Sequence, residues 1–157
     1  MKKIIIIAIA LIASLFVNIL NSYAENKMKN SFAIKSWDEA LYLELDNGTK
    51  YSKVKLVKEY TGELKGTGHL EYLIAYNKAG DATFTGIEHF EGSIDGYVGS
   101  FATIHEGMFK EGTVESSFEI IKNSQNGELT QLTGTGNYKT GHSMTVDFHF
   151  NYSFAEK

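Results

Sequence analysis

Apolar and polar residues alternate along most of the chain after residue 30, which is the period of a half-buried β-strand. The clearest stretch covers residues 142–154. There the apolar side chains of every second residue from Met144 to Phe154 occupy one face, and polar side chains from Ser143 to Ser153 occupy the other. No segment after residue 24 has a convincing helical period. The pattern therefore predicts an all-β protein.

The centre of the chain predicts three consecutive antiparallel strands, near residues 66–76, 82–91 and 97–109. They are separated by short glycine-bearing turns at 77–81 and 92–96. Such turns suit hairpins, because the backbone there needs the positive φ that glycine adopts without strain. The centre of the chain is therefore predicted to be a β-meander.

Further strands are expected at residues 30–39, 51–63 and 113–121, and at 142–154. Residues 40–50 contain the turn signal Asp46-Asn-Gly-Thr and a short alternating segment that fits an edge strand. Residues 122–139 break the rhythm, with turns near 124–127 and 134–137. We interpret Lys53, Lys55 and Lys58 as solvated lysines that protect an edge strand from unwanted pairing.

Seven to nine short strands joined by tight turns indicate a sandwich or a barrel. The meander favours a single antiparallel β-barrel of about eight strands, lipocalin-like in general shape, because sequential hairpins close naturally and closure removes free edges. A barrel of this size either packs its lumen with side chains or holds one small ligand.

The first 24 residues have the features of a secretory signal peptide. Lys2 and Lys3 precede an apolar run, and Ser22-Tyr-Ala24 places small residues where signal peptidase requires them. A retained membrane anchor is the alternative, since the run approaches the length needed to span a bilayer. We expect cleavage after Ala24, a short extension at 25–30, one barrel domain at 31–155, and a periplasmic or secreted protein without a stable membrane anchor.

The amino-acid composition limits the kinds of molecule that the protein is expected to bind. The chain has no Cys, so disulfides are excluded, and all 15 basic residues are lysines against 19 acidic residues. Without Lys2 and Lys3 the balance becomes 13 against 19, a net charge of −6. An acidic chain without Arg lacks the planar fork used to grip phosphates and guanine, so nucleic acid is not an expected partner. A homo-oligomer is compatible with the sequence.

Several motifs together resemble a bacterial family. They are Ser36-Trp-Asp-Glu39, Gly68-His-Leu-Glu-Tyr-Leu-Ile-Ala-Tyr76, Gly86-Ile-Glu-His-Phe-Glu-Gly92, Gly99-Ser-Phe101, His105-Glu-Gly-Met-Phe109 and Gly127-Glu-Leu-Thr-Gln-Leu-Thr-Gly-Thr-Gly136. The family consists of small proteins classed as a domain of unknown function. Its fold is similar to the allene oxide cyclase barrel. The resemblance implies an allene-oxide-cyclase-like fold and no agreed activity.

Glu88 and His105 are the candidate catalytic residues. Glu88 shares strand parity with Phe84 and Phe90, which places a carboxylate on an otherwise apolar or small face, and His105 has the matching parity on the next strand. A Glu–His pair in a pocket is a plausible proton-transfer couple. Structural roles for both residues are the alternative, and one bulge between them would turn one side chain outward.

Trp37, Tyr72 and Phe90 are the candidate ligand-binding residues. Tyr72 aligns with Leu70, Ile74 and Tyr76 and is expected to point inward, although Glu71 inward remains open. Trp37 is either a roof for a pocket or a core residue. A mostly apolar pocket with a few polar anchors suits a small hydrophobic ligand.

Other chemistries have little support. Asp147, His149 and His142 are too few for a convincing metal site, there is no nucleophile elbow, and no glycine-rich loop precedes a helix. We therefore expect no metal and no cofactor. Two functions stay open: an exported protein that binds a small apolar molecule without turnover, and a cyclase or isomerase that acts on an unsaturated small molecule through Glu88 and His105.

Overall fold

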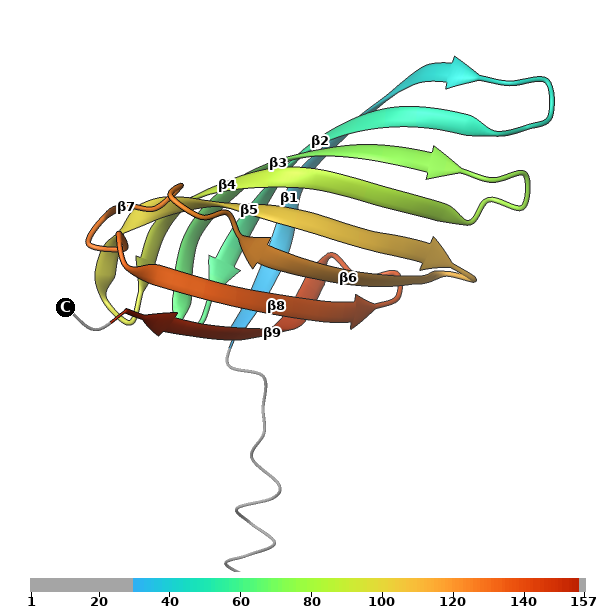
Figure 1. Cartoon of the computed structure of the whole chain (residues 1–157). Coiled ribbons are helices and arrows are strands. Elements are labelled where there is room, and N and C mark those ends of the chain that lie inside the picture. The colour runs from blue at the N-terminus through green and yellow to red at the C-terminus, as the bar shows by residue number, and fades with distance from the viewer. Residues whose placement is uncertain (1–29, 156–157) are drawn as a thin grey trace, which may run out of the picture.

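The computed structural model describes residues 30–155, which form nine antiparallel β-strands (Figure 1). The predicted all-β fold is confirmed. The expected signal peptide at 1–24 lies outside the described residues, as does the extension at 25–30 except for its last residue. The strands are β1 (Asn30–Glu44), β2 (Lys50–Thr61), β3 (Leu64–Tyr76), β4 (Ala82–Ile94), β5 (Tyr97–Lys110), β6 (Thr113–Ile120), β7 (Asn126–Gly127), β8 (Leu132–Thr140) and β9 (Thr145–Phe154).

Eight of these strands are hydrogen-bonded in a ring. Strands β1 to β6 follow one another, β8 pairs with β6, and β9 pairs with both β8 and β1; the short β7 pairs with β5. The first and last strands close the ring through Asn30–Ala33 of β1. Every strand therefore presents one side-chain face to the inside of the ring.

Strand β1 is longer than the sequence pattern indicates. It merges the expected strand at 30–39 with the alternating segment that follows, and the turn comes only at residues 45–49. Its register against β2 shifts between Ile34 and Ser36 and again between Leu41 and Leu43. The outer half of β1 and its partner β2 form a hairpin that projects beyond the other strands, in cyan in Figure 1. This hairpin forms part of the rim at one end of the ring.

The register of the central meander determines which side chains point inward. Strands β4 and β5 pair without a break from Ala82 opposite Phe109 to Ile94 opposite Tyr97. With no bulge between them, Glu88 and His105 keep the same parity, and both are 1 % exposed. Tyr72 is also buried, whereas Glu71 is exposed, so the inward orientation predicted for Tyr72 is correct.

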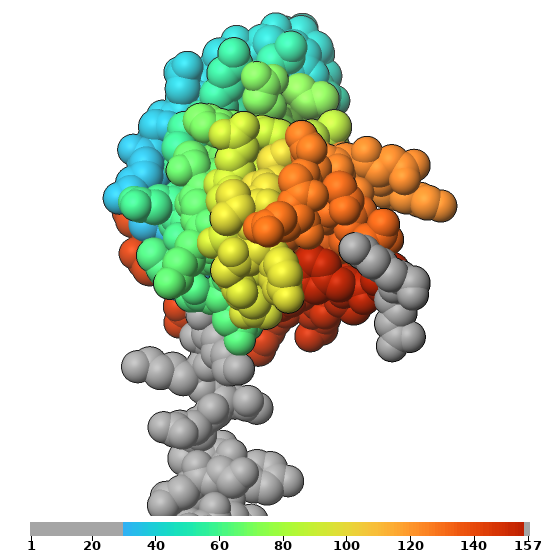
Figure 2. Space-filling model, turned by 90° about the vertical axis from the view of Figure 1, so that its left-hand side faces the viewer, coloured from blue at the N-terminus to red at the C-terminus, as the bar shows by residue number. Residues whose placement is uncertain are grey.

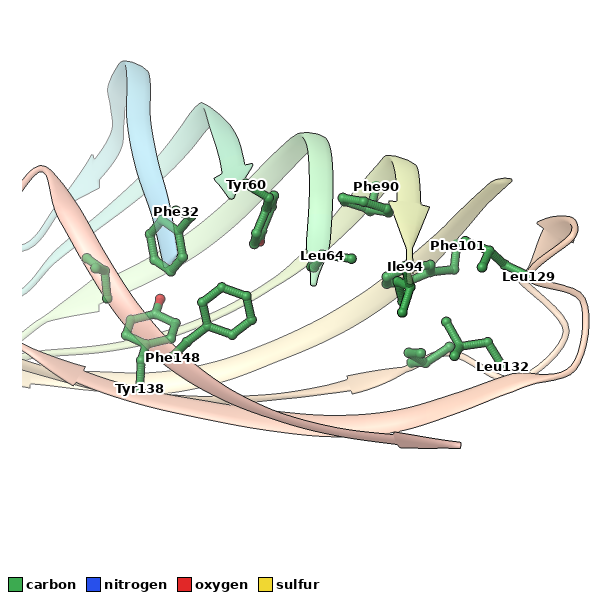
Figure 3. Packing of buried hydrophobic residues seen from close by; sticks show 12 residues of the cluster. Phe32, Tyr60, Leu64, Phe90, Ile94, Phe101, Leu129, Leu132, Tyr138 and Phe148 are labelled. Carbon is green, nitrogen blue, oxygen red and sulfur yellow. The ribbon is translucent and has the colours of Figure 1, made fainter. Parts of the chain in front are cut away.

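One end of the ring is filled by side chains. Phe101, Ile94, Leu129 and Leu132 pack there, and Phe32, Tyr60 and Phe148 continue the cluster toward the middle (Figure 3). Figure 2 looks at this end and shows the orange segment around β7 between the yellow β4–β5 region and the red last strand. Of the irregular segment expected at 122–139, residues 122–131 thus serve as packing for this end of the ring, whereas the turn expected near 134–137 is wrong because these residues lie in β8.

A second apolar cluster occupies the opposite end. It contains Val54, Leu56, Leu70, Tyr72, Ile74, Ala82 and Phe84, all contributed by β2, β3 and β4. This cluster is less filled than the first, and the cavity described below lies against it. Between the two clusters lies a small group of buried polar side chains.

Candidate functional site

The polar group inside the ring comes from β2, β4 and β5. Lys58 and Tyr60 point inward from β2, Glu88 from β4, and Thr103 and His105 from β5. Each sits among apolar neighbours on the inner face of its strand. Because buried polar groups are costly unless paired, their partners decide whether the site is stable.

Glu88 is the common acceptor of this group. Its Oε2 lies 2.9 Å from Nζ of Lys58 and 2.8 Å from Nε2 of His105, and its Oε1 accepts a 2.6 Å hydrogen bond from the hydroxyl of Tyr60. Burial alone would raise the pKa of Glu88. The positive charge of Lys58 and the hydrogen bonds from His105 and Tyr60 outweigh burial and lower that pKa to about 2. Glu88 is therefore ionised at neutral pH.

Lys58 supplies the opposite charge at the same depth. Its side chain is 2 % exposed, and its ammonium lies 4.6 Å from the centre of the Phe32 ring and 3.5 Å from the hydroxyl of Tyr60. The aromatic ring face is attractive to a cation. With Glu88, this gives a buried ion pair in which each charge has further polar or aromatic contacts.

A glycine on the intervening strand makes this pairing possible. Gly68 of β3 lies opposite Lys58 of β2 and opposite Phe90 of β4 in the register, and the Glu88 side chain reaches over it from β4. A Cβ at this position would overlap Oε1 of Glu88 and contact the ring of Tyr60. The missing side chain leaves the space through which β2 and β4 residues meet across β3.

His105 is neutral and carries its proton on Nε2. An ionised carboxylate only accepts hydrogen bonds, so the nitrogen 2.8 Å from Glu88 must be an N–H; the Thr103 hydroxyl lies 2.9 Å from the same nitrogen. Nδ1 is buried and has no hydrogen-bond partner among residues 30–155. Burial and the charge of Lys58 lower the pKa of His105 despite the opposing effect of Glu88.

A cavity of about 300 Å³ lies next to this group, toward the hairpin end. Its apolar wall includes Leu56, Ile74, Ala82, Phe84, Phe109 and Val114. Its polar lining includes Lys58, Tyr72, Tyr76, Tyr138, Thr140 and Ser143. Lys58 is thus the residue that connects the buried ion pair with the cavity.

Two tyrosine hydroxyls meet at the cavity wall. The hydroxyls of Tyr72 and Tyr138 are 3.4 Å apart, which is long for an O–H···O hydrogen bond. Burial, followed by the neighbouring Tyr138, raises the pKa of Tyr72 well above its usual range. Tyr72 therefore remains a neutral donor, and the weak bond between the two hydroxyls leaves capacity for a better acceptor.

The rim of the cavity is held by Glu39. Its carboxylate accepts hydrogen bonds from Ser52 (2.6 Å), Tyr76 (2.7 Å) and the indole of Trp37 (3.2 Å). Trp37 is 49 % exposed and lines the cavity. Glu39 therefore fixes two aromatic side chains at the entrance.

The structure brings together four of the five site residues expected from sequence. Glu88 and His105 are in direct contact behind the cavity, and Trp37 and Tyr72 line it. The expectation that Phe90 walls the same cavity is not met. Phe90 packs on Phe101 in the filled end of the ring, with ring centres 4.8 Å apart, and Phe84 forms the wall instead.

The interpretation of Lys58 as a solvated edge residue is wrong. Strand β2 pairs with both β1 and β3, so it is not an edge, and Lys58 is 2 % exposed. Its parity is that of Val54, Leu56 and Tyr60, all buried, whereas Lys53 and Lys55 have the opposite parity and are exposed. That shared parity is the sequence signal that could have identified Lys58.

Residues 30–155 contain no group of three or more His, Cys, Asp or Glu side chains arranged to hold a metal ion. They also contain no helix long and apolar enough to cross a membrane.

The fold and site define a class of small all-β protein, with a ring of antiparallel strands, a buried polar group and a cavity at one end. The chain belongs to the DUF3224 family, described as a protein of unknown function, whose profile matches residues 28–152. No protein with curated annotation matches the chain.

A solved structure supports the fold. The chain is similar to a crystal structure of a protein of unknown function from the DUF3224 family of Shewanella oneidensis MR-1, with 24 % sequence identity and a TM-score of 0.64. The match covers 83 % of this chain and 100 % of the other. At this identity the likeness supports the arrangement of strands and carries no functional assignment.

Replacing Lys58 tests the buried ion pair. Lys58→Met leaves the Glu88 carboxylate buried without its counter-charge, and we expect it to lower the free energy of unfolding by about 3–5 kcal/mol. The double variant Lys58→Met/Glu88→Gln removes both charges and should recover part of that loss. The measurement is urea-induced unfolding at pH 7.

The matched control for this experiment is Lys55→Met on the same strand. The Lys55–Glu71 pair is 3.5 Å long and both side chains are more than 70 % exposed, so its loss should change stability by less than about 1 kcal/mol. Equal effects of the two single replacements would contradict a special role for the buried pair.

Stability should depend on pH through His105 and Glu88. The pKa of His105 is lowered on folding, so its contribution is fully present above pH 6.5 and decreases as the pH falls below that value, because the unfolded chain then binds the extra proton. Glu88, with a folded pKa of about 2, loses its contribution between about pH 4.5 and 2.

We expect His105→Gln to flatten the pH dependence below pH 6.5, where one proton can change stability by at most about 1.4 kcal/mol per pH unit. Urea unfolding at several pH values between 7.5 and 5 measures this slope. The exposed His149 gives the control His149→Gln. If both variants keep the slope of the unmodified protein, His105 is not its source.

Proposed function

We propose that the protein binds a small, largely apolar molecule in the cavity at the hairpin end and acts as a carrier or sensor without turnover. The observation that carries this proposal is the cavity itself: about 300 Å³, mostly aromatic and aliphatic in lining, with a few polar groups at fixed positions. This is the composition expected of a small-molecule site. Trp37 and Tyr72 are its proposed contact residues from the sequence.

Catalysis by Glu88 and His105 is less well supported. The resemblance to the allene oxide cyclase barrel motivates a cyclase or isomerase, but one architecture hosts many functions. Neither Glu88 nor His105 is among the cavity-lining residues, and Glu88 already accepts hydrogen bonds from three donors. A general acid or base must reach the proton that it transfers. The present arrangement therefore favours binding.

We further propose that the protein is exported and works in the periplasm or outside the cell. The support is the sequence of residues 1–24, with Lys2 and Lys3 ahead of an apolar run and Ser22-Tyr-Ala24 at its end.

Export predicts a defined new N-terminus. When the full-length sequence is expressed in a bacterial host, the protein should be found outside the cytoplasm, and its mass should be that of a chain that starts at Glu25. Ala24→Leu, which places a large residue at the cleavage position, should block processing. Intact mass spectrometry of the fractionated cells measures both. Exported protein that still starts at Met1 would contradict cleavage.

Filling the cavity tests binding. Ala82 is 6 % exposed and lines the cavity, so Ala82→Leu should occupy part of its volume and weaken binding of hydrophobic dyes and of any copurifying molecule by about tenfold or more. Dye fluorescence and native mass spectrometry of the purified protein are the measurements.

The control is Thr83→Leu, a change at the next residue on the exposed face of the same strand. It adds comparable apolar surface without entering the cavity and should leave the tight binding unchanged. If neither variant alters binding, or if the unmodified protein binds no dye and carries no small molecule, the cavity is not a binding site.

A further inference from the structure

We propose that the ligand of this cavity is an uncharged molecule with an apolar body and one hydrogen-bond acceptor, such as a carbonyl oxygen, which is held between Lys58 and the Tyr72–Tyr138 hydroxyl pair. This inference rests on the proposed binding function and specifies the chemical class that the cavity accepts. It follows from three properties of the lining: its charge, its donors and its volume.

Charge is the first property. Lys58 is the one charged side chain among the cavity-lining residues of the described chain, and its charge is already balanced by Glu88 at 2.9 Å. A carboxylate ligand would therefore bring a second negative charge into a site with one cation. A buried charge without its own partner is strongly disfavoured.

A cationic ligand is disfavoured for the complementary reason. It would face the ammonium of Lys58, while Glu88 lies behind Lys58 and does not line the cavity. The chain also offers no Arg that could be recruited for an anion. Within the lining, the charge of Lys58 is already balanced by Glu88, so a neutral ligand is the one that leaves this pair undisturbed.

Donors are the second property. Lys58 has three N–H bonds; one goes to Glu88, and the contact with the Tyr60 hydroxyl is long at 3.5 Å. The hydroxyls of Tyr72 and Tyr138 are 3.4 Å apart, and the Tyr72 hydroxyl also has a hydrogen bond with Ser116. Lys58 and the two tyrosines line the same cavity. The inner wall of the cavity thus offers N–H and O–H donors, some of whose present hydrogen bonds are long. An acceptor atom on the ligand would give these donors a better partner.

Volume is the third property. About 300 Å³ holds roughly ten non-hydrogen atoms, if each takes about the 30 Å³ share of a water molecule. The remaining wall, including Ile74, Phe84, Phe109 and Val114, is apolar. The ligand body enclosed by the cavity is therefore a small hydrocarbon group, either a ring or a short branched chain.

A series of four probes of the same shape tests the proposal. Acetophenone, cumene, benzoate and 1-phenylethylammonium each have nine non-hydrogen atoms and differ in one substituent: a neutral acceptor, no acceptor, an anion and a cation. Calorimetric titration at pH 7.5 should show acetophenone binding at least tenfold more tightly than benzoate and 1-phenylethylammonium.

Tyr138→Phe removes one donor and keeps the ring. It should weaken the binding of acetophenone about 2- to 13-fold, which is the effect of losing one hydrogen bond of 0.5–1.5 kcal/mol. The affinity for cumene, which has no acceptor, should stay the same or rise slightly. Tyr72→Phe is the second variant if Tyr138→Phe melts below the working temperature. Tyr152→Phe, whose lost hydroxyl donates to Asp95 away from the cavity, is the matched control and should not alter either probe.

The outcomes separate this proposal from the binding function itself. If acetophenone or cumene binds but Tyr138→Phe and Tyr72→Phe affect both alike, or benzoate binds as tightly as acetophenone, the assigned ligand class is wrong and the cavity remains a binding site. If none of the four probes binds the unmodified protein, the proposed binding function fails, and the ligand class fails with it.

Discussion

The structure depends on a charge-matching constraint inside the ring. A buried ammonium and a buried carboxylate are each unstable alone, and the pair persists because Lys58 and Glu88 are 2.9 Å apart with Tyr60, His105 and the Phe32 ring around them. The constraint reaches into the backbone, because the strand between the two charges must carry Gly68 at the crossing point. It also explains why His105 is held neutral: burial and the charge of Lys58 lower its pKa, and a protonated ring would carry an Nδ1–H with no acceptor among residues 30–155.

This polar group divides the interior into two parts with different properties. On one side, Phe90, Phe101, Leu129 and Leu132 fill the ring and are at most 2 % exposed. On the other side, the apolar walls stay apart and enclose a cavity. Lys58 stands at the boundary and is shared by both.

Strand parity made much of this arrangement predictable. Alternation predicts that the side chains of Glu88 and His105 point inward, and they do so because β4 pairs with β5 without a bulge. Tyr72 also points inward, as alternation predicts. The same alternation places Lys58 on the inner face of β2. The prediction that it is solvated was wrong because it relied on the general preference of lysine for water and not on this alternation. Such an expectation fails when a carboxylate two strands away supplies the counter-charge, which no local pattern reveals.

Local sequence patterns could not predict where the cavity lies or that Phe90 packs away from it. Both Phe84 and Phe90 alternate inward on β4, yet one borders the cavity and the other is packed against Phe101. The difference comes from segment 122–131, which supplies Leu129 to one end of the ring and has no counterpart at the other. Its irregular sequence gives no indication of where it packs, because that position is fixed by pairing with residues nearly thirty positions earlier in the chain, such as Gly99 with Gly127.

The projecting half of β1 has an exposed edge at which another chain could pair. Beyond Ile34, its outer edge pairs with no other strand within residues 30–155, and the side chains of Leu41, Tyr42 and Leu43 are exposed. An exposed apolar strand edge is a template for aggregation. Here the two register shifts bend the edge, and charged side chains from Lys35 to Glu44 interrupt it. These are devices that natural sheets use against edge-to-edge pairing, and they let the hairpin hold the cavity rim while remaining in solvent.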